Sequence, residues 1–186
     1  IHTDEIIDAN EKPSIAVRKG KNSSMGMAIQ SVKFGKADAI VSAGNTGALM
    51  AMAKLFLRPI EGINRPAIAA YFPTITGESC MLDLGANIDC DAKNLVQFAF
   101  MGQAFANIVM GVDNPSISLL NIGEEEQKGL DYIKEASQIL SDLKSQINYA
   151  GFIEGDKIAQ GISDVIIADG FTGNVSLKTA EGTALL

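Results

Sequence analysis

The stretch Ser42-Ala43-Gly44-Asn45-Thr46-Gly47 decides how we interpret the fold. The apolar run before it, residues 37–41, predicts a buried strand, and residues 48–57 after it predict a buried helix. A strand, a glycine-containing polar turn and a helix start place backbone N–H groups where they can face a ligand. The stretch therefore predicts a turn that can hold an anion.

The same pattern recurs near the other end of the chain. Residues 165–168 predict a strand, Asp169-Gly170-Phe171-Thr172-Gly173-Asn174 follows as a polar turn, and a helix comes next. We expect the two turns to face one site and to hold an anion there.

Predicted strands and helices alternate along most of the chain. Strands are expected at residues 67–72, 80–82, 116–120, 149–153 and 165–168, with the first of them, bounded by Pro66 and Pro73, a candidate antiparallel member. This alternation predicts an α/β fold of three layers (α/β/α) with a mostly parallel sheet. Turns at the carboxyl ends of parallel strands meet at one edge. We therefore expect the turns 44–46, 85–87, 123–124 and 170–174 to converge.

Two helices carry a clear apolar face. Residues 92–110 present Leu95, Phe98, Phe105 and Ile108 on one side, and a helix opening with Glu124 to Glu126 presents Leu130, Ile133, Leu140 and Leu143. The basic run Arg18-Lys19-Gly20-Lys21-Asn22-Ser23-Ser24 is expected to be a loop, and Ser23 or Ser24 to cap the helix after it.

Composition limits the function. The chain has 186 residues, 47% of them hydrophobic and 20% charged, as expected for one globular domain. Its net charge of −7 argues against nucleic acid as a general partner. No apolar run approaches the roughly 20 residues of a membrane-spanning helix. Because the chain starts without methionine and stops inside a predicted helix, we expect a single α/β catalytic domain, residues 1–186, incomplete at both ends.

Cysteine and histidine are scarce. Two cysteines, Cys80 and Cys90, make no disulfide framework, so buried free thiols and a cytoplasmic location are expected. The one histidine, His2, lies in the irregular start, which excludes a Ser-His-Asp set, and no metal-ligand spacing is present.

Charge near the helix starts sorts the candidate anion sites. The helices after Asn45-Thr46 and after Thr172 begin without acidic residues, whereas the helix after Asn87 begins with two aspartates. Each turn could instead have a purely structural role as an N-cap. Because two such turns are present, the structural role and anion binding are about equally favoured. Asp83 and Asp169 are either hydrogen-bond hubs or site acids, and Lys128 is by default a solvated lysine.

The basic residues Arg18, Lys19 and Lys21 stand out in this acidic chain. They are either a solvated turn or a docking patch for an acidic protein or a phosphate-bearing ligand.

At its motifs the sequence resembles the bacterial phosphate acyltransferases of the PlsX family. The resemblance is collinear over nearly the whole chain and rests on these segments: residues 21–25 (KNSSM), 42–50 (SAGNTGALM), 65–67 (RPA), 82–87 (LDLGAN), 119–123 (LLNIG) and 169–175 (DGFTGNV). The family's amino-terminal strand and the helical region after Lys178-Thr179-Ala180-Glu181-Gly182 are absent from these 186 residues.

The resemblance implies an enzyme of phospholipid synthesis that moves a fatty acyl group from acyl carrier protein to inorganic phosphate. It also implies a homodimer in the cytoplasm that associates peripherally with the membrane, without a metal or nucleotide cofactor. The implied fold is that of phosphotransacetylase and of the isocitrate and isopropylmalate dehydrogenases.

Phosphate is already ionised, so its attack on a thioester needs positioning and charge balance more than a strong base. We expect Asn45, Thr46, Thr172, Gly173 and Asn174 to supply phosphate and oxyanion donors, with Asn87 as a further donor. Lys128 resembles a family site lysine and would balance charge, and Arg18, Lys19 and Lys21 would dock the carrier protein. The alternatives are a short-chain phosphotransacetylase-like enzyme using coenzyme A, and a non-catalytic protein that binds acyl phosphate or carrier protein.

Overall fold

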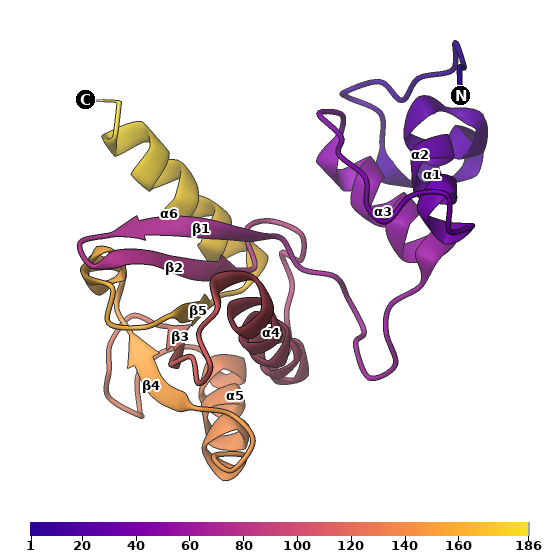
Figure 1. The fold of residues 1–186 in the computed structure, drawn as a ribbon. Helices are drawn as coiled ribbons and strands as arrows, with labels where there is room; N and C mark the ends of the chain where they lie inside the picture. Colours follow the sequence, from indigo (N-terminus) through magenta and orange to yellow (C-terminus); the bar gives the residue numbers. More distant parts are fainter. Residues whose placement is uncertain (186) are drawn as a thin grey trace. The chain divides into compact units, whose positions relative to one another are not determined.

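The computed structural model describes residues 1–185 and divides the chain into two compact units, residues 1–66 and the residues from 67 onward (Figure 1). Each unit has its own apolar core, so each is described by itself. That the two form one domain stays a prediction.

The first unit is helical. It consists of α1 (Pro13–Lys19), the short 3₁₀ helix η1 (Gly20–Asn22), α2 (Ser24–Lys33) and α3 (Thr46–Leu57). The Ser23 hydroxyl accepts a hydrogen bond from Gly26 N at 3.2 Å, which confirms Ser23 as the cap of α2. The core is small and holds Ala16, Met25, Ile29, Ala48 and Met52.

Two predictions for this unit are wrong. The basic run at residues 18–24 is not a loop, because Arg18 and Lys19 end α1 and η1 follows. The predicted buried strand at residues 37–41 is irregular, and Val41 is fully exposed. A strand is stable only beside a hydrogen-bonded neighbour, and residues 1–66 contain no other strand.

The second unit is built on a five-stranded sheet. The strand order is β1-β2-β5-β3-β4, and only β1 runs antiparallel, beside β2. This confirms a mostly parallel sheet with its first strand antiparallel. Pro73 lies in this edge strand, where proline is tolerated. The strands are β1 (Ala69–Thr74), β2 (Gly77–Leu82), β3 (Ile117–Leu120), β4 (Tyr149–Ile153) and β5 (Val165–Ile167).

Helices cover both faces of this sheet (Figure 1). On one face, α4 (Ala92–Phe105) and α5 (Asp131–Asp142) pack against Leu82, Ile117 and Ile167. On the other face, α6 (Gly170–Thr183) packs against residues such as Met81 and Ile166. Successive strand residues thus point to opposite helical layers, and the three-layer α/β/α prediction is confirmed in this unit.

The predicted helices need two corrections here. The helix predicted over residues 92–110 consists of α4 followed by a π-helical segment, η2 (Ala106–Met110). Within it, Ile108 is 84% exposed and does not belong to the buried face. Residues 124–126 lie in a turn, and α5 begins only at Asp131. A side chain closes this turn: Asn121 Nδ2 donates to the carbonyls of Gly123 and Lys128 at 3.1 and 3.0 Å.

The remaining described element is η3 (Gly155–Gln160), which connects β4 to β5. None of the helices in residues 1–185 combines the length and the apolar character needed to cross a bilayer.

Candidate functional site

Three of the four turns predicted to converge lie at one edge of the second unit. Strands β2, β5 and β3 are neighbours and parallel, so the turns at residues 83–87, 168–174 and 121–130 follow their carboxyl ends side by side. This is the edge at which α/β sheets bind ligands. The fourth turn, residues 44–46, belongs to the first unit, and its approach to this edge stays a prediction.

Asp83 is the hydrogen-bond hub of the first of these turns. Its carboxylate is fully buried and accepts from the backbone N–H groups of Ile68 and Asn87 at 2.8 and 2.7 Å. It also accepts from Ala86 N and from the Asn87 side-chain amide at 3.2 and 2.9 Å. Buried carboxylates are tolerated when they are satisfied in this way. Asn87, a predicted donor, therefore serves this hub in the structure.

Asp169 organises the start of α6. One carboxylate oxygen caps the helix by accepting from Thr172 N at 2.9 Å, and the other accepts from the Thr172 hydroxyl at 2.7 Å and the Tyr132 hydroxyl at 3.1 Å. Burial, followed by the negative charge of Asp169, raises the pKa of Tyr132 to about 12. Tyr132 comes from α5, so the network connects helices on opposite faces of the sheet.

This cap corrects one sequence argument. The start of α6 was predicted to be free of acidic groups, yet the buried Asp169 carboxylate occupies it. The start of α3 does lack acidic residues, as predicted. An added anion is favoured at a helix start that carries no charge of its own, so the two starts differ in electrostatics.

Close packing places Asn174 beside the turn after β2. A Cβ on Gly173 would lie 1.9 Å from the Asp83 carbonyl oxygen, so only glycine fits there. The Gly170 N–H donates to Asn87 O at 2.8 Å, and Asn174 Nδ2 donates to Leu84 O at 3.2 Å. Asn174 is nonetheless exposed at this edge, and its predicted role as a donor to phosphate or oxyanion stays a prediction.

Lys128 lies on the turn after β3 and is half exposed. Its ammonium pairs with Glu125 at 3.2 Å, with side-chain exposures of 53% and 58%. The pKa of Glu125 is lowered mainly by a hydrogen bond from the backbone N–H of Glu125 itself, and secondly by the hydrogen bond and positive charge of Lys128. Glu124 on the same turn pairs with Lys157 of η3. Lys128 is therefore accessible, but a substrate anion would compete with Glu125 for its charge.

Sequence reasoning gave no role to Asn121, which is 7% exposed and holds this turn together. Among residues 1–185, its Oδ1 is the buried side-chain atom without a hydrogen-bond partner. Gly129 lies directly against it, since a Cβ there would be 2.0 Å from Oδ1. The position of Asn121 within the family-like segment 119–123 was a signal that could have identified it, whereas nothing in the sequence pointed to Tyr132.

In the first unit, Asn45 caps α3. Its Oδ1 accepts from Ala48 N at 3.0 Å, and its Nδ2 donates to the carbonyls of Ala9 and Glu11, both at 2.9 Å. These bonds are the structural alternative foreseen for this turn. Thr46 is exposed, and its hydroxyl has no partner in residues 1–185. Binding of phosphate by Asn45 and Thr46 stays a prediction.

Arg18, Lys19 and Lys21 are all exposed on the first unit, and no carboxylate among the described residues pairs with them. The first two end α1, where cations suit the helix dipole. The structure thus shows an accessible basic patch, and its docking role stays a prediction.

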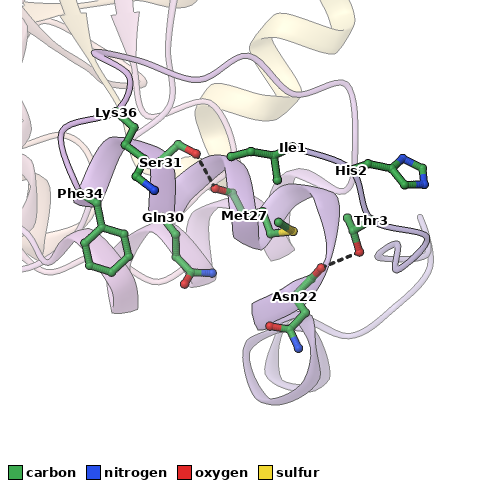
Figure 2. Close-up of a pocket in the computed structure, with 9 residues that line it drawn as sticks. All are labelled: Ile1, His2, Thr3, Asn22, Met27, Gln30, Ser31, Phe34 and Lys36. Carbon is green, nitrogen blue, oxygen red and sulfur yellow. Dashed lines mark hydrogen bonds between the residues drawn. The ribbon is translucent and has the colours of Figure 1, made fainter.

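A cavity of about 340 Å³ in the first unit includes none of the predicted site residues (Figure 2). Two of its polar groups are committed within the chain: Ser31 Oγ donates to Met27 O and Thr3 Oγ1 donates to Asn22 O, each at 2.9 Å. The carboxyl edge of the second unit remains the better candidate site.

A family profile described as "Fatty acid synthesis protein" matches residues 1–186. The chain belongs to this family. Two similar members are a phosphate acyltransferase of Rhodospirillum centenum, 56% identical over 185 residues, and one of Paramagnetospirillum magneticum, 54% identical. Each match covers 100% of the chain but only 52% and 53% of the relative, so the chain spans about half the length of these family members.

Two solved structures share this fold but have much lower sequence identity to the chain. EutD phosphotransacetylase from Staphylococcus aureus matches 88% of the chain and 56% of its own length, with a TM-score of 0.65 and 19% identity. A branched-chain phosphotransacylase from Enterococcus faecalis matches 94% and 66%, with a TM-score of 0.57 and 14% identity. At this identity the likeness shows the fold alone, and it confirms the predicted likeness to phosphotransacetylase.

Proposed function

We propose that the intact protein transfers a fatty acyl group from acyl carrier protein to inorganic phosphate and releases acyl phosphate. The observation that carries the proposal is the 54–56% identity, over the whole chain, to proteins named phosphate acyltransferase. The family description, fatty acid synthesis, supports a fatty acyl substrate. The proposed pathway is phospholipid biosynthesis.

The carboxyl edge of the second unit supports this chemistry. Asn174 is exposed there and carries a side-chain amide, and Lys128 on the neighbouring turn carries an accessible cation. Phosphate attacks the thioester carbonyl, a carbon–oxygen bond forms, and the carbon–sulfur bond breaks to release the carrier thiol, which takes up a proton. Hydrogen-bond donors set in advance around the tetrahedral oxyanion lower the barrier to this step.

In this proposal Asn174 and Lys128 are the catalytic residues. Asn174 Nδ2 has a second hydrogen to offer the oxyanion beyond the one given to Leu84. Lys128 balances the negative charge of the bound phosphate once the Lys128 ammonium turns away from Glu125. Thr172 would bind phosphate through its hydroxyl only after releasing Asp169, and the Gly173 N–H, which donates to the Asp169 carbonyl at 2.9 Å, would have to be shared with phosphate.

The partners follow from the same proposal. Arg18, Lys19 and Lys21 form a basic patch suited to an acidic carrier protein. The protein would act in the cytoplasm as a homodimer associated peripherally with the membrane. Asn45 and Thr46 at the start of α3, and Asn87 in the turn after β2, are proposed as further phosphate donors.

The test uses the intact protein with long-chain acyl carrier protein and inorganic phosphate. Acyl phosphate is trapped as the hydroxamate, and we expect product only when phosphate is present. Absence of product from every acyl donor would overturn the proposal.

The fold likeness to phosphotransacetylases favours one other candidate, a short-chain acyl transfer between coenzyme A and phosphate. Product from acyl-coenzyme A but not from the carrier protein would establish it. Binding of acyl phosphate or carrier protein without any turnover would instead indicate a non-catalytic binding protein.

A further inference from the structure

Another cavity lies at the carboxyl edge of the sheet in the second unit, between the turn after β3 and the start of α6. It measures about 490 Å³, within the range of roughly 300–1,000 Å³ typical of small-molecule sites. Leu120, Ile122, Leu130 and Ile133 supply apolar lining, and Thr172 and Ser176 of α6 also line the cavity. The cavity therefore adjoins residues of the proposed phosphate site.

The polar side chains that line the cavity, Asn121, Thr172 and Ser176, have no free hydrogen-bond donor to offer a ligand. Thr172 Oγ1 donates to Asp169 at 2.7 Å, and Ser176 Oγ donates to the Thr172 carbonyl at 2.8 Å. Both hydrogens of the Asn121 amide go to backbone carbonyls. A sugar or an anion needs hydrogen-bond donors, whereas a hydrocarbon chain needs only apolar contact. The lining thus suits a hydrocarbon.

Large apolar side chains are left in water around this cavity. Ile122 is 78% exposed and Leu130 is 60% exposed. Such grouping of exposed apolar residues beside a cavity marks a surface that a ligand covers.

We infer that this cavity binds the fatty acyl chain of the substrate, with the carbonyl end at Thr172 and the methylenes along Ile122, Leu130 and Ile133. The inference rests on the proposed acyl transfer for its choice of occupant. According to this inference, the preferred length of the acyl chain is set by the turn after β3 and by η3, which contributes Gly155 to the lining of the cavity.

Gly155 offers a clean way to fill the cavity. A Cβ there meets no atom within 4 Å, and its φ lies outside the left-handed region, so a side chain is tolerated by the backbone. Gly182 of α6 has the same two properties and does not line the cavity. Gly155→Leu and Gly182→Leu are therefore matched variants.

Equilibrium binding of radiolabelled palmitate to the intact protein tests the inference without turnover. We expect Gly155→Leu to weaken palmitate binding about tenfold or more, as expected when a pocket of this size is filled, and Gly182→Leu to leave it unchanged. Leu130→Ser is a second variant, because serine is a good N-cap for α5 while it removes part of the apolar lining. It should weaken binding about fivefold or more.

The outcomes separate the two proposals. Unchanged palmitate affinity in Gly155→Leu and Leu130→Ser, or no binding by the unaltered protein, would overturn the acyl-chain assignment even if acyl phosphate is formed. Loss of palmitate binding in these variants, in a protein that forms no acyl phosphate, would support the acyl-chain site and overturn the proposed reaction. Thermal unfolding of each variant checks that it is folded.

Discussion

The side-chain amide of Asn174 donates a hydrogen bond to the backbone carbonyl of Leu84, 3.2 Å away, and so joins the start of α6 to the turn after β2. The two residues are 90 positions apart in the sequence and follow the carboxyl ends of neighbouring parallel strands. The exposed amide is thereby oriented at the edge where the substrate is proposed to bind.

Replacing Asn174 with alanine should lower acyl phosphate formation about 100-fold, the scale of losing one oxyanion donor. Stability should change little, since one partly exposed hydrogen bond contributes about 1 kcal/mol. The hydroxamate assay and urea unfolding measure the two quantities. Asn148→Ala is the matched control, because Asn148 Nδ2 also donates to a carbonyl, Asn114 O, at 3.2 Å, but before the amino end of β4. Equal turnover in the two variants would remove Asn174 from the mechanism.

Lys128→Met should lower kcat/KM for phosphate about tenfold or more, because the cation is proposed to balance charge on the nucleophile. Its pair with Glu125 is exposed to solvent and therefore contributes little to stability, so the unfolding free energy should stay nearly constant. Lys134→Met removes a lysine paired in the same way, with Asp131 three residues earlier at 2.9 Å. If steady-state kinetics show the same effect for both variants, Lys128 has no specific role.

The sheet was predictable from the sequence because its strands are short apolar runs bounded by turn residues. Residues 149–153, for example, were expected as a strand and form β4. Residues 37–41 show the same local pattern yet form no strand, because strand formation depends on a neighbour that local pattern does not encode. Helix starts failed for a related reason. Glu124 to Glu126 resemble a first helical turn, but the Asn121 side chain closes them into a loop.

The sequence allowed the turns of the candidate site to be predicted, but not the hydrogen bonds within them. Parallel strands place residues 83–87, 121–130 and 168–174 together, and alternation in the sequence suffices to foresee this. That Asp169 would cap α6 and bind Tyr132 depends on one backbone conformation and on a helix 37 residues away. The consequence is that the start of α6 carries a negative charge that the sequence argument did not assign to it.

Gly173→Ala and Gly182→Ala test the close approach of α6 to the turn after β2. The first variant forces a Cβ to within 1.9 Å of the Asp83 carbonyl oxygen, and we expect a loss of about 1–3 kcal/mol in unfolding free energy. The second adds a methyl group to open space in the same helix and should stabilise the protein by about 0.5–1 kcal/mol. Urea unfolding gives both values. Equal stability of the two variants would contradict the packing described for Gly173.

Alkaline pH should destabilise the second unit through two partly buried tyrosines, Tyr132 and Tyr149. Burial, followed by Asp169, raises the pKa of Tyr132 to about 12, and burial raises the pKa of Tyr149 to about 12, whereas an unfolded tyrosine has a pKa of about 10. The unfolded chain therefore releases these protons first. The resulting stability is fully present below about pH 10 and is lost as the pH rises to about 12. Thermal unfolding across this range should show a smaller decline in Tyr132→Phe than in the unaltered protein, and an identical decline would contradict the assigned role of the Tyr132 hydroxyl.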